Sequence, residues 1–526
     1  MEACVAAVES VASALSSAQD WWSPLAATFL TLTGLQQLDD LTTRLCQSPD
    51  TMVVQLLQTG LRPVTFSVQP LLLLVLAFVV LQAVRRLFPA KQHEKVYVLD
   101  FSVHQPDKSW AFSRSKVREL CEKRELFTPE DIDFQQKIAY RTGLGDETAV
   151  CPAIQSGDPK QLGIEAARFE FGATCFTTIA DLLQKTGVSP QQVDYVITNS
   201  SLFNPTPSLS AAIMNHFKMS SRTLGYSLGG MGCSAGVIAL DLARELLELH
   251  PNKIALVVSH ENITNNYYCG NDRSMLIPNC LFRSNGSAVL LSNKAGHARR
   301  AKYSIKHVVR TNLAANDVAY NCVMQTEDAE GKLGVRLNKD LIKVGADALK
   351  HNMTALGPLV LPWSEQLKFA GNVALRSAVK RSKALAGALP AGWLRPYIPD
   401  FTQAFDFFCI HTGGRGIIDG LEAQMQLSRK QVEPSRASLY RFGNTSSTSI
   451  WYELAYIEST AGLSRGQRVW QLAFGSGFKF NSAVLVANRR IADQHAAWQG
   501  FDSVAMWAEL DELDKAISRR GSTATS

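Results

Sequence analysis

The sequence predicts an α/β protein built from two similar halves, and three observations carry this prediction. Beyond Lys95, runs rich in β-branched residues alternate with helical patterns, which is typical of a sheet covered by helices. Several short motifs recur in the same order in two parts of the chain. With 526 residues, the chain also exceeds what one hydrophobic core usually covers.

The segment before Lys95 has a different character. Residues 64–84 read VTFSVQPLLLLVLAFVVLQAV, 21 residues without a formal charge, which is long enough to cross a bilayer as a helix. Arg85 and Arg86 follow at once, so the positive-inside rule predicts that the chain beyond them lies in the cytosol. Residues 21–35 are apolar but short and predict a second span or an interfacial helix. We therefore expect residues 1–94 to form a membrane anchor, with a buried core helix as the alternative for 64–84.

Eight apolar runs predict the strands of the α/β part. They are residues 96–103, 193–198, 253–259, 287–292, 303–310, 405–411, 468–475 and 482–487. The fourth and the eighth run resemble each other closely, since SAVLLSN starts at Ser287 and SAVLVAN at Ser482. The second and the sixth run also match, as VDYVITNS and FDFFCIHT.

A longer match lies between these strands. LGYSLGGMGCSAGVIALDLA (224–243) has its counterpart in SLYRFGNTSSTSIWYELA (438–455), a short apolar run followed by glycine and a predicted helix. The order strand, turn and helix, strand, strand therefore occurs twice. This order predicts two similar halves, residues 95–295 and 296–490, that pack face to face. Chance similarity of short apolar strands is the alternative.

The segment between the matched motifs, residues 317–399, carries no strong strand pattern. Around residues 360–396 it interleaves apolar and basic residues with a single acid, Glu365. This pattern is typical of a helix on an anionic membrane surface, and a solvated surface helix is the alternative. The tail, residues 491–526, has a helical pattern until the polar RRGSTATS (519–526), which we expect to be disordered.

Charge and cysteine content narrow the functional classes. The net charge of +6 is small for this length and predicts no nucleic-acid partner. The ten cysteines are scattered, without a CxxC pair or the Cys/His spacing of a metal site. The sequence therefore predicts a reduced compartment and no structural zinc.

Cys233 lies among four glycines at the start of a predicted helix, in YSLGGMGCSAGVIALDLARELL (226–247). A thiol in the first turn of a helix is close to the free N–H groups, which favours the thiolate. The glycines give a substrate access to the backbone, whose N–H groups can stabilise an oxyanion. The stretch alone leaves a buried structural cysteine equally open. A GxGxxA dinucleotide fingerprint at 230–235 is a weaker alternative, because the thiol would occupy the pyrophosphate site.

Two residues of the second half are expected to face Cys233. His411 ends a predicted strand, and the open loop 412–416 follows it. Asn444 holds the position that corresponds to Cys233 in the matched motif. If a pseudo-twofold axis relates the halves, both helix starts approach each other and these side chains meet. A core histidine and an asparagine helix cap are the alternatives.

Seven motifs together resemble one known family. They are NPTPSLSA (204–211), LGGMGCSAG (228–236), ENITNNYYCGNDRSMLIPNCLFR (261–283), LGPLVLPWSEQ (356–366), PYIPDF (396–401), FCIHTGGRGIIDGLE (408–422) and RFGNTSSTSIWYELAY (441–456). With them, and with its N-terminal anchor, the chain closely resembles the plant-type 3-ketoacyl-CoA synthases over about residues 95–490. The resemblance implies the thiolase-like fold, in which two duplicated βαβαβαββ halves form a five-layer αβαβα core.

The resemblance implies a condensing enzyme of very-long-chain fatty acid elongation. Cys233 would take the acyl group of an acyl-CoA as a thioester. His411 and Asn444 would hold the thioester oxygen of malonyl-CoA, whose decarboxylation gives an enolate that attacks the acyl carbonyl. The loop Gly475, Ser476 and Gly477 is implied as a further oxyanion and substrate-binding element. No metal or redox cofactor is implied.

The same resemblance implies a location and partners. We expect an endoplasmic reticulum membrane protein with its catalytic part facing the cytosol, in contact with membrane lipid, and a homodimer. The other elongase enzymes, a 3-ketoacyl-CoA reductase, a dehydratase and an enoyl-CoA reductase, are expected partners.

Some positions depart from the family pattern. Phe407, Tyr440 and Asn312 stand where the family usually has histidine, which puts the support of His411 and the pH profile in question. His260 stands where a small residue is usual, and we interpret it as a packing variation. A soluble chalcone-synthase-like polyketide synthase and an inactive elongase scaffold are the alternative functions.

Overall fold

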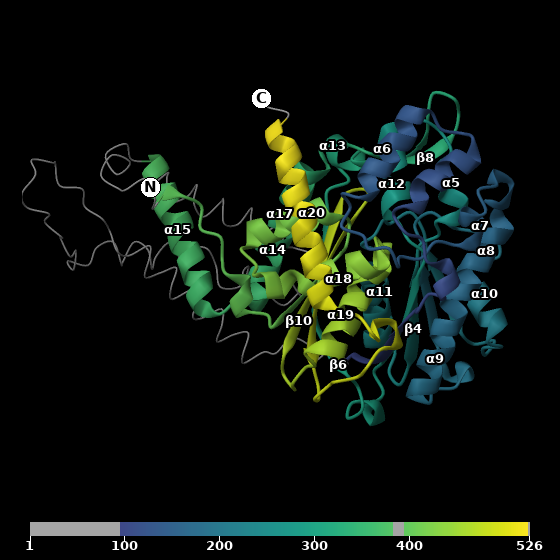
Figure 1. The fold of residues 1–526 in the computed structure, drawn as a ribbon. Helices are drawn as coiled ribbons and strands as arrows, with labels where there is room; N and C mark the ends of the chain where they lie inside the picture. Colours follow the sequence, from purple (N-terminus) through teal and green to yellow (C-terminus); the bar gives the residue numbers. More distant parts are fainter. Residues whose placement is uncertain (1–94, 382–393, 524–526) are drawn as a thin grey trace, which may run out of the picture. The chain divides into compact units, whose positions relative to one another are not determined.

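One mixed sheet of nine strands organises the part of the chain that the computed structural model describes, residues 95–381 and 394–523 (Figure 1). The expected anchor, residues 1–94 with the candidate span 64–84 and the segment 21–35, lies outside the described residues. Among the helices of the described ranges, none has the length and apolar character needed to cross a membrane.

The strands of the sheet follow the order β3-β2-β4-β5-β1-β6-β11-β10-β9. Their bounds are β1 Tyr97–Val103, β2 Tyr195–Asn199, β3 Leu224–Leu228, β4 Ile254–His260, β5 Gly286–Ser292, β6 Tyr303–Asn312, β9 Phe407–Ile410, β10 Arg468–Gly475 and β11 Lys479–Ala487. All eight predicted strands are confirmed within a few residues. The sequence prediction missed β3 and a separate hairpin, β7 Val323–Glu327 and β8 Leu333–Leu337.

The strand pairing repeats in the two halves of this sheet. β2 runs parallel to β4, which pairs antiparallel with β5, and β5 pairs antiparallel with β1. In the same way, β9 runs parallel to β10, which pairs antiparallel with β11, and β11 pairs antiparallel with β6. The two series join where β1 pairs antiparallel with β6, through the residue pairs Tyr97 with Ser304 and Val98 with Tyr303.

Two buried helices lie between the two series of strands. α11 (Ala235–Leu249) packs against β4 and also against β11, while α19 (Ser449–Thr460) packs against β9 and also against β1. Their apolar side chains share one core, which buries nearly all of α19 and residues 235–241 of α11. α9 (Thr177–Thr186) packs on β1 and β5, and α14 (Leu341–Val360) packs on β6 and β11, each against a separate core.

The remaining helices surround this framework (Figure 1). They are α5 Lys116–Arg124, α6 Pro129–Ala139, α7 Pro152–Gln155, α8 Ile164–Phe171, α10 Leu209–His216, α12 Arg273–Leu281, α13 Asp317–Tyr320, α15 Trp363–Arg381, α17 Arg415–Met425, α18 Arg429–Phe442 and α20 Ser503–Thr523. Local sequence sets several of their starts. The Thr128 side chain caps α6 with Pro129 in its first turn, and Ser208 caps α10.

Two expectations about the chain beyond residue 317 are wrong. The hairpin β7–β8 lies in a segment that carried no strong strand pattern, because its strands are short and half-exposed. The tail expected to be disordered from residue 519 instead continues α20 to Thr523. Tertiary contacts hold α20 upstream of this point: Met506 and Leu510 are buried in the core, and Asp511 pairs with Arg429 of α18 at 2.8 Å.

Candidate active site

Cys233 lies in the turn between β3 and α11, two residues before the helix begins at Ala235. Gly232 has a φ of +71°, a backbone conformation that side chains other than glycine rarely adopt. A Cβ atom at Gly232 would also lie 2.4 Å from the backbone nitrogen of Ser476. Glycine is therefore required directly before the thiol, both for the turn and for the close approach of a second loop.

That second loop is the predicted Gly475–Gly477 element. A Cβ atom at Gly475 would lie 2.6 Å from the backbone nitrogen of Cys233, so the two loops are in direct backbone contact. Gly477 has a φ of +97° and forms the turn between β10 and β11. Lys479 Nζ donates to the carbonyl of Ser476 at 2.8 Å and fixes this turn. The structure thus brings Gly475 and Ser476 beside Cys233, with Gly477 one residue further along the turn.

His411 directly follows β9, which ends at Ile410, and is 1% exposed. Its backbone N–H donates to the carbonyl of Leu472, and its ring stands edge-on to Phe474 with centroids 4.8 Å apart. Nδ1 lies 2.8 Å from Ser449 Oγ. Because a hydroxyl can donate or accept, Ser449 supports either tautomer of the imidazole.

Asn444 lies in the loop between α18 and α19 and is 3% exposed. Its Oδ1 accepts the backbone N–H of Ser446 at 2.9 Å, which fixes the amide so that Nδ2 faces the loop after His411. Nδ2 lies 3.4 Å from the carbonyl of Gly413, at the long end of the hydrogen-bond range. One donor of this amide is therefore held near His411 with little competition from the protein.

Ser446 is the residue that connects the three predicted site residues. Its hydroxyl is close enough to the Cys233 thiol, and its backbone close enough to the His411 ring, to shift the pKa of each group, and its N–H donates to Asn444 Oδ1 at 2.9 Å. Its φ of +52° is unusual for a residue other than glycine. The sequence analysis did not single out Ser446, since only the fold shows that this residue contacts both loops.

The hydroxyl residues 446–449 also join the two halves of the chain. Each bonds a different partner, and three of these partners belong to the first half. The pairs are Ser446 with Glu261 at 3.0 Å, Ser447 with Asn199 at 2.6 Å, Thr448 with Asn285 at 2.6 Å and Ser449 with His411 at 2.8 Å. This run of hydroxyls, visible in the sequence as SSTS, thus holds the His411 and Asn444 loops against the Cys233 half.

Burial dominates the protonation of the site. It raises the pKa of the Cys233 thiol to about 12; the Ser446 hydrogen bond acts in the opposite direction, and the nearby Glu261 carboxyl adds to the rise. Desolvation therefore acts against the thiolate that the free N–H groups of the helix start favour. Burial also lowers the pKa of His411 to about 3, so its imidazole is neutral at physiological pH.

The three positions that lack a family histidine do not contact His411 through hydrogen bonds. Phe407 begins β9, at the opposite end of the strand from His411. The Tyr440 hydroxyl donates to Glu509 of α20, and Asn312 Oδ1 accepts the N–H of Ala314 at 2.9 Å. The ring of His411 is instead held by Ser449 and Ser446.

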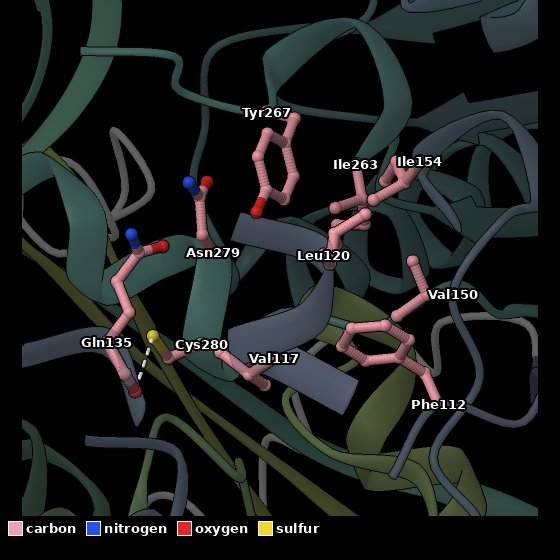
Figure 2. Close-up of a pocket in the computed structure, with 10 residues that line it drawn as sticks. All are labelled: Phe112, Val117, Leu120, Gln135, Val150, Ile154, Ile263, Tyr267, Asn279 and Cys280. Carbon is pink, nitrogen blue, oxygen red and sulfur yellow. Dashed lines mark hydrogen bonds between the residues drawn. The ribbon is translucent and has the colours of Figure 1, made fainter. Parts of the chain in front are cut away.

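Two of the cavities in the described part differ in character. The first, drawn in Figure 2 between α5, α6 and α12, has a volume of about 10 Å³, too small for more than one water. The second, of about 430 Å³, is apolar and lies between α14 and α17 over Phe474, Phe478 and Phe480. Phe474 also contacts the His411 ring, so the larger cavity begins one side chain away from the site.

Comparison with known proteins first defines a class. The family described as “FAE1/Type III polyketide synthase-like protein” matches residues 88–378, and “Chalcone and stilbene synthases, C-terminal domain” matches residues 398–488. The solved structure of a fungal type III polyketide synthase has a TM-score of 0.56 at 18% identity, over 75% of this chain and 100% of that chain. The fold is therefore that of the type III polyketide synthase class.

Curated relatives narrow the class to a family. 3-Ketoacyl-CoA synthase 17 of Arabidopsis thaliana is 50% identical over 397 residues, 75% of this chain and 79% of that protein. 3-Ketoacyl-CoA synthase 5 of the same plant is 49% identical over 396 residues, 75% of this chain and 78% of the relative. The probable 3-ketoacyl-CoA synthase 20 of Oryza sativa subsp. japonica is 46% identical over 405 residues, 77% and 75% of the two chains. The chain belongs to the 3-ketoacyl-CoA synthase family, as its motifs predicted.

Proposed function

We propose that this chain condenses malonyl-CoA with a long-chain acyl-CoA, which gives CO2, CoA and a 3-ketoacyl-CoA two carbons longer. Family membership supports the reaction class. The observation that supports the site is the contact of Ser446 with Cys233, His411 and Asn444. In this proposal the reaction opens very-long-chain fatty acid elongation and needs no metal or redox cofactor.

In the first half-reaction, Cys233 Sγ attacks the carbonyl carbon of the acyl-CoA and the bond to the CoA sulfur breaks. The thiol must lose its proton, and with a pKa of about 12 it needs a base. The neutral imidazole of His411 takes this proton and returns it to the departing CoA sulfur. The N–H groups of Cys233 and of the Gly475–Gly477 loop stabilise the negative charge on the acyl oxygen.

In the second half-reaction, the thioester oxygen of malonyl-CoA accepts hydrogen bonds from His411 and Asn444. The C–C bond to the carboxylate breaks and CO2 leaves. The electron pair of that bond forms an enolate, whose negative charge His411 and Asn444 stabilise. The enolate carbon attacks the acyl-Cys233 carbonyl. Cys233 leaves as a thiolate and takes up one proton from solvent.

We further propose that the acyl chain occupies the apolar cavity between α14 and α17. A Cβ atom at Gly416 or Gly420 would meet nothing within 4 Å, so both glycines leave this space open. A glycine inside a helix costs about 0.5–1 kcal/mol relative to alanine, so the open space is kept at the expense of helix stability. Gly420→Leu should reduce condensation of a long-chain acyl-CoA at least about tenfold and spare a short-chain one. Equal losses with both, or the same effect from Gly296→Leu at an open position elsewhere, would contradict the assignment.

One experiment tests the reaction itself. Microsomes from yeast that express the full chain are incubated with labelled malonyl-CoA and saturated or monounsaturated acyl-CoAs. We expect extension by two carbons, its loss in Cys233→Ala, and its retention in Cys269→Ala, which removes the other half-buried cysteine of the described part. Extension that survives Cys233→Ala would exclude this nucleophile. Absence of extension with the unchanged chain would favour an inactive scaffold.

The location and partners belong to the same proposal. The uncharged residues 64–84, followed by Arg85 and Arg86, support an anchor in the endoplasmic reticulum membrane with the described part in the cytosol. A homodimer and the three further elongase enzymes complete the proposal. The placement of α11 and α19 between the two strand series supports a five-layer thiolase-like core of two duplicated halves. Protease added to sealed microsomes should digest the chain beyond Lys91, and full protection would contradict the orientation.

A further inference from the structure

The ring of Phe474 lies between the predicted site residues and the larger apolar cavity. Phe474 precedes Gly475, the last residue of β10, whose backbone contacts that of Cys233. On one side, the ring stands edge-on to the ring of His411, with centroids 4.8 Å apart. On the other side, the same ring lines the cavity of about 430 Å³ between α14 and α17. A chain that passes from the thiol into this cavity therefore meets the Phe474 ring.

The strand arrangement explains why one side chain reaches both places. β9, the edge strand beside β10, ends at Ile410, and its pairing with β10 stops at Leu472. Successive side chains of a strand point to opposite faces of the sheet. Ala473 accordingly belongs to the core that α11 and α19 share, whereas Phe474 belongs to the core under α14 and α17. Beyond the end of β9, no strand of the described part lies between Phe474 and the loop that follows His411.

The ring is packed tightly on one side and loosely on the other. On the loop side, a Cβ atom at Gly413 would lie 2.9 Å from Cε2 of Phe474, so the ring fits only because residue 413 is glycine. On the cavity side, the rings of Phe478 and Phe480 have their centroids 6.5 and 6.0 Å from that of Phe474, and the cavity adjoins all three rings. The Phe474 ring therefore has room to turn toward the cavity and none toward the loop.

The cavity walls favour an alkyl chain as the group that displaces this ring. Apart from Gln424, the lining residues are apolar or glycine. An alkyl chain in this space replaces one apolar surface by another and leaves no polar group without a partner. Its burial becomes more favourable with each methylene group, so a long chain displaces the ring more readily than a short one.

We infer that Phe474 is a movable gate, which closes the cavity from Cys233 at rest and is displaced when a long alkyl chain enters. The inference rests on the proposed function in taking an acyl chain as the ligand, and it adds the residue that controls entry of that chain. Phe474 does not touch the reacting atoms in this scheme. It acts as a specificity-determining residue, because a chain too short to pass the ring gains nothing from the cavity.

The test labels Cys233 directly and uses no acyl-CoA. The purified full chain in detergent reacts at about pH 9 with N-ethyl or N-dodecyl iodoacetamide, and mass spectrometry measures the labelling rate of the Cys233 peptide. The peptide of Cys269, the other half-buried cysteine of the described part, corrects for reagent held in micelles. Phe474→Ala should raise the dodecyl-to-ethyl rate ratio at Cys233 several-fold, and Phe474→Leu should give an intermediate ratio. An unchanged ethyl rate shows that the site is still folded.

A matched variant controls for the loss of a buried ring. Phe405 is 4% exposed and belongs to the same core as Phe474, but it does not line the cavity. Phe405→Ala should leave the dodecyl-to-ethyl ratio unchanged. A ratio that stays the same in Phe474→Ala, or rises equally in Phe405→Ala, would overturn the inference.

A second comparison distinguishes a movable gate from a fixed wall. Gly420→Leu places a side chain in the cavity while Phe474 stays as it is. If the ring opens, this change should lower the dodecyl-to-ethyl ratio several-fold, whereas Gly296→Leu, at an open position outside the cavity, should not. No effect of Gly420→Leu would show that the dodecyl chain never passes the ring, and would overturn the gate.

The outcomes separate the gate from the condensing function. Two-carbon extension by the unchanged chain, with a labelling ratio that ignores Phe474→Ala, overturns the gate alone. Absence of extension, together with the expected labelling ratios, overturns the condensing function and leaves the gate in place.

Discussion

The resting site combines a thiol that holds its proton with an imidazole that is neutral. Burial raises the pKa of Cys233 to about 12 and lowers that of His411 to about 3, so an ion pair between them is disfavoured. The Ser446 hydroxyl opposes part of this rise, because it acts to lower the pKa of the Cys233 thiol. The nucleophile is therefore activated when a proton moves during acylation, rather than stored as a thiolate.

This protonation state predicts the pH dependence of Cys233 alkylation. A raised pKa means that the thiolate fraction grows tenfold per pH unit until the pH approaches about 12. The rate of iodoacetamide labelling of the Cys233 peptide, measured by mass spectrometry, should thus keep rising from neutral pH into the alkaline range in which the protein stays folded. A plateau near neutral pH would show a stabilised thiolate and contradict the prediction.

Ser446 gives a second prediction at this scale. Ser446→Gly keeps the positive φ without strain but removes the hydroxyl that contacts Cys233 and Glu261. We expect kcat for condensation to fall by about 10–100-fold, with a smaller effect on KM for acyl-CoA, because thiol activation rather than binding is lost. Ser438→Ala removes a buried hydroxyl without a hydrogen-bond partner in the described part and should change neither constant. A similar loss in both variants would contradict the role of Ser446.

At the scale of elements, the two halves differ where their sequences still match. LGYSL forms the edge strand β3, whereas the matching residues 438–442 end helix α18. α18 packs on α19 and β9, and α20 packs on α18 in turn. The duplication is thus kept in strands β2, β4 and β5, which correspond to β9, β10 and β11. It is lost at the outer edge, where β3 has no counterpart strand among the described residues.

The docking of α20 on α18 predicts a stability effect. Trp507 lies over the guanidinium of Arg429 at 3.9 Å, and its Nε1 donates to Glu433 at 2.9 Å. Trp507→Ala should destabilise the protein by about 2–3 kcal/mol, since it removes a half-buried ring and a cation–π contact. Thermal unfolding followed by circular dichroism should show a lower midpoint, whereas Val504→Ala, at a 76% exposed position of the same helix, should match the unchanged chain. A midpoint unaffected by Trp507→Ala would show that α20 contributes little.

At the scale of the whole described unit, a buried ion cluster lies where the two strand series join. Lys302, fully buried beside the start of β6, bonds Asp100, Glu458 and Asp493, each at 2.7 Å. Burial acts against the charged form of Lys302, but Glu458 and Asp100 outweigh it and raise the pKa of Lys302. Burial alone would raise the pKa of Glu458, yet His495 and Lys302 hold it below its ordinary value.

We expect removal of the Lys302 charge to cause a loss of stability that depends on pH. A carboxyl whose folded pKa is lowered contributes stability above its unfolded pKa and loses that contribution as pH falls. Lys302→Met should therefore cost about 3–5 kcal/mol at neutral pH, and the difference from the unchanged chain should shrink toward about pH 4. Urea unfolding at several pH values measures this, with the exposed Lys515→Met as the control. A difference that grows as pH falls would contradict the assignment.

Much of the site follows from motifs that the sequence displays. Cys233, His411 and Asn444 stand at strand ends and helix starts that the repeated pattern predicts, and the matched order brings those ends to one region. Ser446 and Ser449 could not be predicted from the sequence, because a positive φ and a contact across two loops leave no mark in local composition. The desolvation that raises the pKa of Cys233 could not be predicted from the sequence either, since it is set by neighbours far apart in the chain.

The sequence by itself determined the α/β class, the eight main strands and the family, because alternating apolar patterns and long motifs are local properties. Only the tertiary structure decided which sheet edge received β3, how far α20 extends and that Glu365 of α15 is buried. These features depend on side chains that meet across the fold, such as Glu365 with Tyr397 or Arg429 with Trp507. Burial and orientation arise from the packed chain as a whole, so no local pattern encodes them.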